Sequence, residues 1–156
     1  MNEVGDAQYR GAEVWTYPRT QIKHQYFKRF ERDLGWSSGP TATWFALQQG
    51  FKEIYIIGMD FGGIKSGTKE KLRINNIYKG TKNYRDAKKE ATFHGNWENQ
   101  MRKNCTQNTN VKFIRICDKH VNEFRYTPKK LRDVANMSMI FYEDFEVLLK
   151  AWPKLR

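Results

Sequence analysis

Apolar residues form two continuous runs that are typical of buried β-strands. The first is Ile54-Tyr55-Ile56-Ile57, which leads into Gly58, and the second extends from Val111 to Cys117. Strands that are apolar on both faces are characteristic of a parallel sheet covered by helices. We therefore predict strands over Ile54–Gly58 and Val111–Cys117 that belong to one parallel sheet.

Helical segments precede and separate these two runs. Pro40–Gln49 comes before the first strand and stops at Gly50, a residue type that commonly ends helices. Asn96–Asn104 lies between the strands and carries Trp97 and Met101 at helical spacing. The order of strand, helix and strand predicts a right-handed β-α-β unit.

Weaker patterns predict further elements towards both ends of the chain. These are a strand within Glu13–Tyr17, an amphipathic helix over Ile22–Leu34, a short helix from Thr127 through Val134, a strand at Met139–Tyr142 and a helix over Glu143–Trp152. In the last helix the side chains expected to face inward are Phe145, Leu148, Leu149 and Trp152. Together the patterns predict an α/β protein, a Rossmann-like three-layer domain with a small, mostly parallel sheet.

Length and charge add two expectations. The chain has 156 residues and no internal repeat or linker, so we predict a single domain over residues 1–156. Its net charge of +11 indicates an anionic partner, such as a nucleotide or a nucleic acid. Residues 63–93 lack a period and are predicted to form a long basic loop, with nine Lys/Arg against three acidic residues between Gly63 and Glu90. The alternative is a solvated loop with surplus lysines.

The start of the first predicted helix is the clearest candidate for ligand binding. Ser38 is predicted to cap it, and Pro40 fits the first turn, where no N–H is needed. The N–H groups and the positive end of a helix attract phosphate. The candidate residues are Ser37, Ser38, Gly39 and Thr41, and the alternative is an ordinary helix cap.

Polar residues near the predicted strand ends extend this candidate site. Asp60 ends the first strand, at the edge where open α/β sheets bind their ligands. His94 directly precedes the crossover helix and is a candidate general base, with a structural histidine as the alternative. Side chains suited to a sugar or nucleoside, and equally to single-stranded nucleic acid, are Asn75, Asn76, Tyr78, Tyr84, Arg85 and Asn96.

Three segments also carry a resemblance to a known family. Ser37–Gly39, Gln49–Tyr55 and Gly58–Phe61 resemble the central motif of the bacterial sialyltransferases of glycosyltransferase family 42. They are similar as well to the related motif of flagellin-glycosylation and pterin-pyrophosphokinase-like proteins. The resemblance covers about residues 36–118. It implies a Rossmann-like fold, a cytidine-nucleotide sugar as donor substrate, transfer without a metal, and His94 as general base.

The chain departs from the family at several positions. Gly62 and Ala91 stand where the family has tyrosines, and nothing before Trp36 matches the family's N-terminal half. The resemblance thus implies a nucleotide-sugar-binding, glycosyltransferase-like domain that corresponds to the second half of the fold, and it leaves open whether that domain is complete or active. The alternative is a non-enzymatic protein that binds single-stranded nucleic acid, or an accessory protein, using the basic loop.

Location and assembly are predicted from the remaining features. The N-terminus lacks the basic and apolar regions of a signal peptide, and no apolar run approaches the roughly 20 residues of a membrane span. Cys105 and Cys117 form no metal-binding or disulfide pattern. We therefore expect a cytoplasmic protein without metal or other cofactor. We also expect homo-oligomers, in contact through the predicted helix Ile22–Leu34.

Overall fold

The computed structural model describes residues 13–18, 27–59, 64–65, 72–73, 96–117 and 129–152. Contacts within the chain divide it into two compact units, Met1–Trp36 and Ser37–Arg156. No helix in the described ranges is both long enough and apolar enough to pass through a bilayer.

The first unit contains a parallel pair of short strands. β1 (Val14–Thr16) pairs with β2 (Phe27–Arg29), so that Val14 lies opposite Phe27. β1 lies within the strand predicted for this segment.

The helix predicted over Ile22–Leu34 is wrong for its described part, because residues 27–29 are β2 and residues 30–34 are not helical. The aromatic residues here pack locally across the strand pair. The Phe30 ring stacks on Trp15, with ring centres 5.7 Å apart, and lies 6.0 Å from Tyr17. Residues 22–26 lie outside the described ranges. The helix that was expected to form the oligomer contact is therefore not present over residues 27–34.

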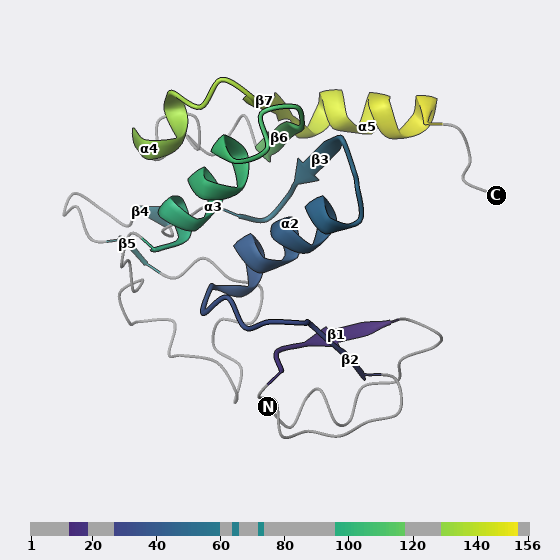
Figure 1. Cartoon of the computed structure of the whole chain (residues 1–156). Helices are drawn as coiled ribbons and strands as arrows, with labels where there is room; N and C mark the ends of the chain where they lie inside the picture. The colour runs from purple at the N-terminus through teal and green to yellow at the C-terminus, as the bar shows by residue number, and fades with distance from the viewer. Residues whose placement is uncertain are drawn as a thin grey trace. The chain divides into compact units, whose positions relative to one another are not determined.

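The second unit is built on a parallel sheet, as predicted (Figure 1). In the described part of the chain its strands are β3 (Glu53–Ile56), β6 (Lys112–Cys117) and β7 (Met137–Phe141), in the order β3-β6-β7. Ile54 pairs with Phe113, and Phe113 pairs with Met137. β7 begins two residues earlier than predicted.

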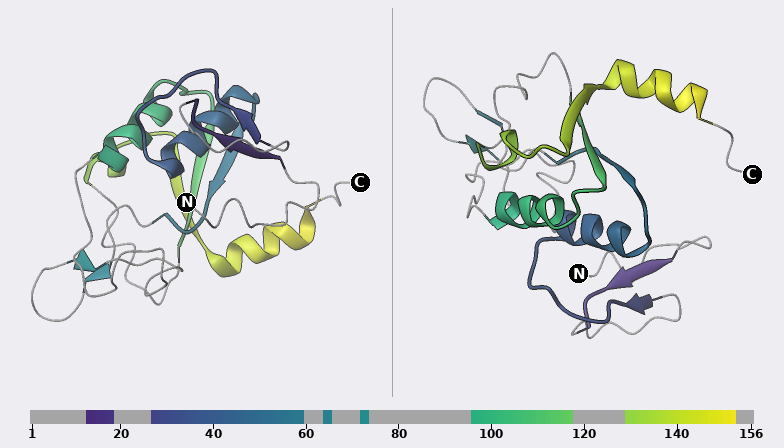
Figure 2. Two further views of the ribbon diagram at one scale, coloured as in Figure 1. Left: turned by 90° about the horizontal axis from the view of Figure 1, so that it is seen from below. Right: turned by 45° about the horizontal axis from the view of Figure 1, so that its top comes forward.

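One face of this sheet is covered by α2 (Ser38–Gln48) and α3 (Asn96–Thr106), which lie side by side in both views (Figures 1 and 2). Both helices agree with the predicted segments to within two residues at each end. α4 (Lys129–Arg132) joins the same core. The buried apolar residues of this core are Ile56, Met101, Cys105, Val111, Phe113, Leu131 and Val134.

The opposite face is contacted by α5 (Tyr142–Ala151), the third layer of a small Rossmann-like arrangement, which projects from the end of β7 (Figure 2, right). The Tyr55 ring contacts Phe145 and Trp152 of this layer, each at 5.4 Å between ring centres. Trp152 faces inward as predicted, but burial on this side of α5 is incomplete, because Leu148, Leu149 and Trp152 are 40%, 52% and 42% exposed. A single helix over three short strands leaves too little sheet surface to bury them.

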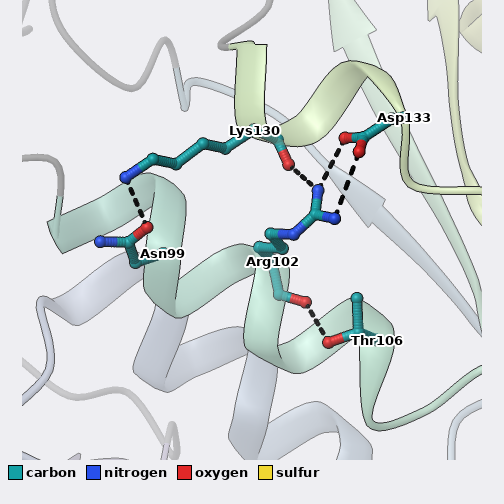
Figure 3. Close-up of polar contacts among 5 residues, drawn as sticks. All are labelled: Asn99, Arg102, Thr106, Lys130 and Asp133. Carbon is teal, nitrogen blue, oxygen red and sulfur yellow. Dashed lines mark hydrogen bonds and ion pairs between the residues drawn. The ribbon is translucent and has the colours of Figure 1, made fainter.

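Polar contacts hold α4 against α3 (Figure 3). Arg102 of α3 donates to both carboxylate oxygens of Asp133, at 2.7 and 3.3 Å, and to the carbonyl of Lys130. This pairing raises the pKa of Arg102 and lowers that of Asp133. Lys130 also donates to Asn99 at 2.7 Å.

Within the predicted basic loop, β4 (Ile64–Lys65) and β5 (Leu72–Arg73) form a short antiparallel pair.

Candidate functional site

The start of α2 lies beside the end of β3, at the carboxyl edge of the parallel sheet. Met59 follows β3 after two residues and packs against Gly39 in the first turn of α2. A Cβ atom at Gly39 would lie 2.6 Å from the Met59 Cε, so the glycine permits this close packing. The candidate residues at the helix start are therefore at the edge where ligands of open α/β sheets bind.

The residue that precedes α2 is Ser37, one position before the predicted cap. It makes no side-chain cap hydrogen bond to the helix. Instead, its N–H and its hydroxyl both donate to the Gln100 side-chain oxygen, each at 3.0 Å. The Ser37 donors predicted to bind phosphate are thus engaged by Gln100.

This contact also determines the orientation of the Gln100 amide. A backbone N–H can only donate, so the amide atom that meets it must be the oxygen. The Gln100 nitrogen, with its two N–H donors, is then directed away from Ser37. Gln100 is a site residue that the sequence analysis missed, and its position four residues after Asn96 on a predicted helix was the available signal.

The N–H groups of Ser38 and Gly39 are the backbone donors that remain at the helix start. The first N–H groups of a helix have no acceptor within it. Pro40 has no N–H, and the N–H of Thr41 donates to the Ser37 carbonyl at 3.0 Å. Ser38 is exposed, whereas Thr41 is buried, so the structure brings Ser37, Ser38 and Gly39 to the edge and turns Thr41 into the interior.

Two amide side chains on α3, those of Gln100 and Asn104, contact this helix start. Asn96, Gln100 and Asn104 are four residues apart and so lie on one side of α3. Asn104 is buried and donates to the Pro40 carbonyl at 2.9 Å, one turn beyond the contact of Gln100 with Ser37. Asn96, a predicted substrate-binding residue, is exposed at the first position of α3 and continues this line towards the sheet edge.

A buried guanidinium adds positive charge at the same edge. Arg115 of β6 is 2% exposed, and its Nε donates to the Met59 carbonyl at 3.2 Å. Met59 therefore connects the arginine to the start of α2. Arg115 was not among the predicted site residues, although a charged residue in the middle of a largely apolar strand was a usable signal.

Glu98 lies in the first turn of α3, and burial raises its pKa, an effect that Lys130 opposes. A raised carboxyl pKa means that Glu98 loses its negative charge more readily as the pH falls.

Seven predicted site residues lie outside the described ranges: Asp60, Asn75, Asn76, Tyr78, Tyr84, Arg85 and His94. Among the residues that the structure does describe, no three His, Cys, Asp or Glu side chains gather in a group that could hold a metal ion.

Comparisons with known proteins identify no relative. No family model matches this chain, and no curated protein or solved structure is significantly similar to it.

Proposed function

We propose that the carboxyl edge of the sheet binds the phosphate of a nucleotide, and that the full ligand is a cytidine-nucleotide sugar. The observation that carries the proposal is the start of α2, where the N–H groups of Ser38 and Gly39 remain as donors and Ser37 orients the Gln100 amide. Met59 connects this helix start to the buried Arg115. Such donors and positive charge favour a phosphate. The net charge of +11 supports an anionic ligand.

The proposed reaction is glycosyl transfer, and its supports are the resemblance of residues 36–118 to the sialyltransferases and the Rossmann-like sheet. In this proposal His94 removes the proton of the acceptor hydroxyl, a task for a neutral imidazole near pH 7. The proposed location is the cytoplasm, which is supported by Cys105 and Cys117 both being free thiols.

The first test compares a nucleotide with its nucleoside. We expect isothermal titration calorimetry to show that cytidine monophosphate binds and that cytidine binds at least about tenfold more weakly, because the phosphate accepts charge-assisted hydrogen bonds. Equal binding of both, or of neither, would remove the phosphate site. Salt-sensitive binding of single-stranded oligonucleotides of any sequence would favour the alternative function, a nucleic-acid-binding protein.

A substitution at Gln100 separates the ligand role from the structural one. In Gln100→Glu the new carboxylate still accepts from Ser37, but the amide donors are replaced by negative charge. We expect the affinity for cytidine monophosphate to fall by about tenfold or more, with little change in melting temperature. The matched control is Gln107→Glu, the same change at an exposed position just beyond α3. Equal affinities of the two variants would contradict the proposed site.

The catalytic part of the proposal has a separate test. His94→Ala should reduce glycosyl transfer by about a hundredfold or more, the usual contribution of a general base, while the affinity for cytidine monophosphate stays the same. Loss of nucleotide binding in this variant would assign His94 to the ligand site and not to proton transfer.

A further inference from the structure

The α5 helix has apolar side chains that the other described residues do not bury. None of its residues is buried, although it carries a valine, two leucines and a phenylalanine. Val147 is 65% exposed, more than any other large hydrophobic residue among those the structure describes. It lies two residues from Phe145, and so on the side of the helix away from the Tyr55 contact.

Val147 belongs to a stripe with the spacing of a helix-packing surface. Its members are Asp144, Val147, Leu148 and Ala151, which recur at intervals of three, one and three residues. This spacing keeps one side of a helix against a partner helix. Ala151 has a small side chain, which allows the backbone of the partner to come close.

The charges beside this stripe indicate what the partner is. Glu143 and Asp144 lie in the first turn of α5, and Lys150 lies in the last. Glu143 and Lys150 are seven residues apart and therefore lie along the same line of the helix. A second α5 that runs in the opposite direction presents its basic end to this acidic end, and the two helix dipoles are also antiparallel.

We infer that α5 is a self-association surface, and that its occupant is α5 of a second copy of this chain, in antiparallel orientation. A two-fold axis between Val147 and Leu148 places Val147 against Leu148 of the partner subunit. The same axis brings Glu143 near Lys150 of the partner subunit, and by symmetry this ion pair forms twice. No part of the inference depends on the proposed nucleotide site.

One pair of ten-residue helices makes a small interface. It covers less than the roughly 800 Å² per partner of a standard protein interface. We therefore expect dissociation constants in the micromolar range, with dimers at high protein concentration and monomers on dilution. Sedimentation equilibrium of the full chain over a range of concentrations measures this constant directly.

Charge reversal tests the antiparallel arrangement. In Lys150→Glu and in Glu143→Lys, both ion pairs become pairs of like charges, and each homodimer should weaken by about tenfold or more. An equimolar mixture of the two variants should associate again, because the heterodimer contains one native pair and one reversed pair. The double variant Glu143→Lys/Lys150→Glu should likewise form homodimers.

These outcomes distinguish a second copy from other occupants. Glu143, Val147 and Lys150 are exposed, so circular dichroism should show all variants folded. Val147→Asp should abolish self-association without unfolding the chain. A wild-type monomer at every concentration would overturn the inference and leave α5 for a different protein. Variants that dimerise like the wild type, or a mixture that fails to associate, would overturn the antiparallel contact.

Discussion

The side-chain nitrogen of Asn136 lies within hydrogen-bond distance of three backbone carbonyls. They belong to Cys105 (3.1 Å), Asn108 (3.0 Å) and Val111 (2.9 Å). The amide has only two N–H donors, so the three carbonyls share them. One side chain thereby joins the end of α3, the turn after it and the residue before β6 to the chain that enters β7.

Replacing Asn136 with alanine should cost stability, because partly buried carbonyls lose their donor. We expect the free energy of unfolding to fall by about 2 kcal/mol for Asn136→Ala, as measured by urea denaturation. The control is Asn99→Ala, which removes an exposed contact with Lys130. Equal losses for the two variants would show that the contacts of Asn136 stabilise no more than a surface contact.

The Cys105 thiol should be unreactive in the folded protein. It is fully buried, and burial raises its pKa to about 12 by disfavouring the thiolate. Since the thiolate is the nucleophile, iodoacetamide at pH 8 should label Cys105 only as fast as the protein unfolds, which mass spectrometry of timed samples would show. Rapid labelling without denaturant would mean that the α3 core opens readily.

The raised pKa of Cys105 also predicts that the stability of the folded protein decreases at alkaline pH. The folded pKa of Cys105 exceeds the ordinary thiol value of 9.0, so its contribution is complete below pH 9 and is lost as the pH rises towards 12. The stability difference between wild type and Cys105→Ala should therefore shrink above pH 9.

At the scale of single elements, α4 depends on its neighbours. A helix of four residues has too few hydrogen bonds to form alone. Its contacts include the side chain of Leu131, which is 2% exposed in the core, and the exposed ion pair between Arg102 and Asp133. The apolar contact should dominate, because exposed ion pairs contribute little to stability.

This ranking is tested by two substitutions. Leu131→Ala should lower the free energy of unfolding by about 3 kcal/mol, the usual cost of removing a buried leucine. Asp133→Asn should produce a much smaller loss in the same denaturation experiment. Comparable losses would show that the ion pair, and not the core, positions α4.

The elements that the sequence predicted well are those whose environment is visible in their own residues. Ile54–Ile57 is apolar throughout, and Val111–Cys117 is apolar except for Lys112 and Arg115, a pattern typical of strands in a covered parallel sheet. The helix predicted to include Phe27–Arg29 was wrong because, over so few residues, the spacing of the aromatic residues fits a helix and a strand equally well. Leu149 misled because periodicity identifies an apolar side of a helix but not whether a surface exists to cover it.

The candidate site was predictable only in part, for a related reason. Ser38 and Gly39 are signalled by local helix-start chemistry. The contact of Gln100 with Ser37 joins residues 63 positions apart and depends on how α2 and α3 pack. No local sequence pattern can reveal a contact between residues so far apart in the chain. The same is true of the hydrogen bond between Arg115 and the Met59 carbonyl.

At the scale of the whole molecule, the core belongs to one of the two compact units. Every residue of the buried cluster lies between Ser37 and Arg156. We expect a chain that begins at Ser37 to keep the circular dichroism and cooperative thermal unfolding of the β3-β6-β7 sheet. Loss of cooperative unfolding on removing residues 1–36 would instead support the predicted single domain over residues 1–156.

The separation of paired residues along the chain sets the order in which this sheet assembles. Phe113 pairs with Met137, 24 residues later, whereas Ile54 pairs with Phe113, 59 residues later. Closing the longer loop costs about 0.8 kcal/mol more in chain entropy. The β6–β7 pair should therefore form in the folding transition state, and β3 should dock afterwards. In stopped-flow kinetics, Ile116→Val in β6 should mainly slow folding, while Ile56→Val in β3 should mainly speed unfolding.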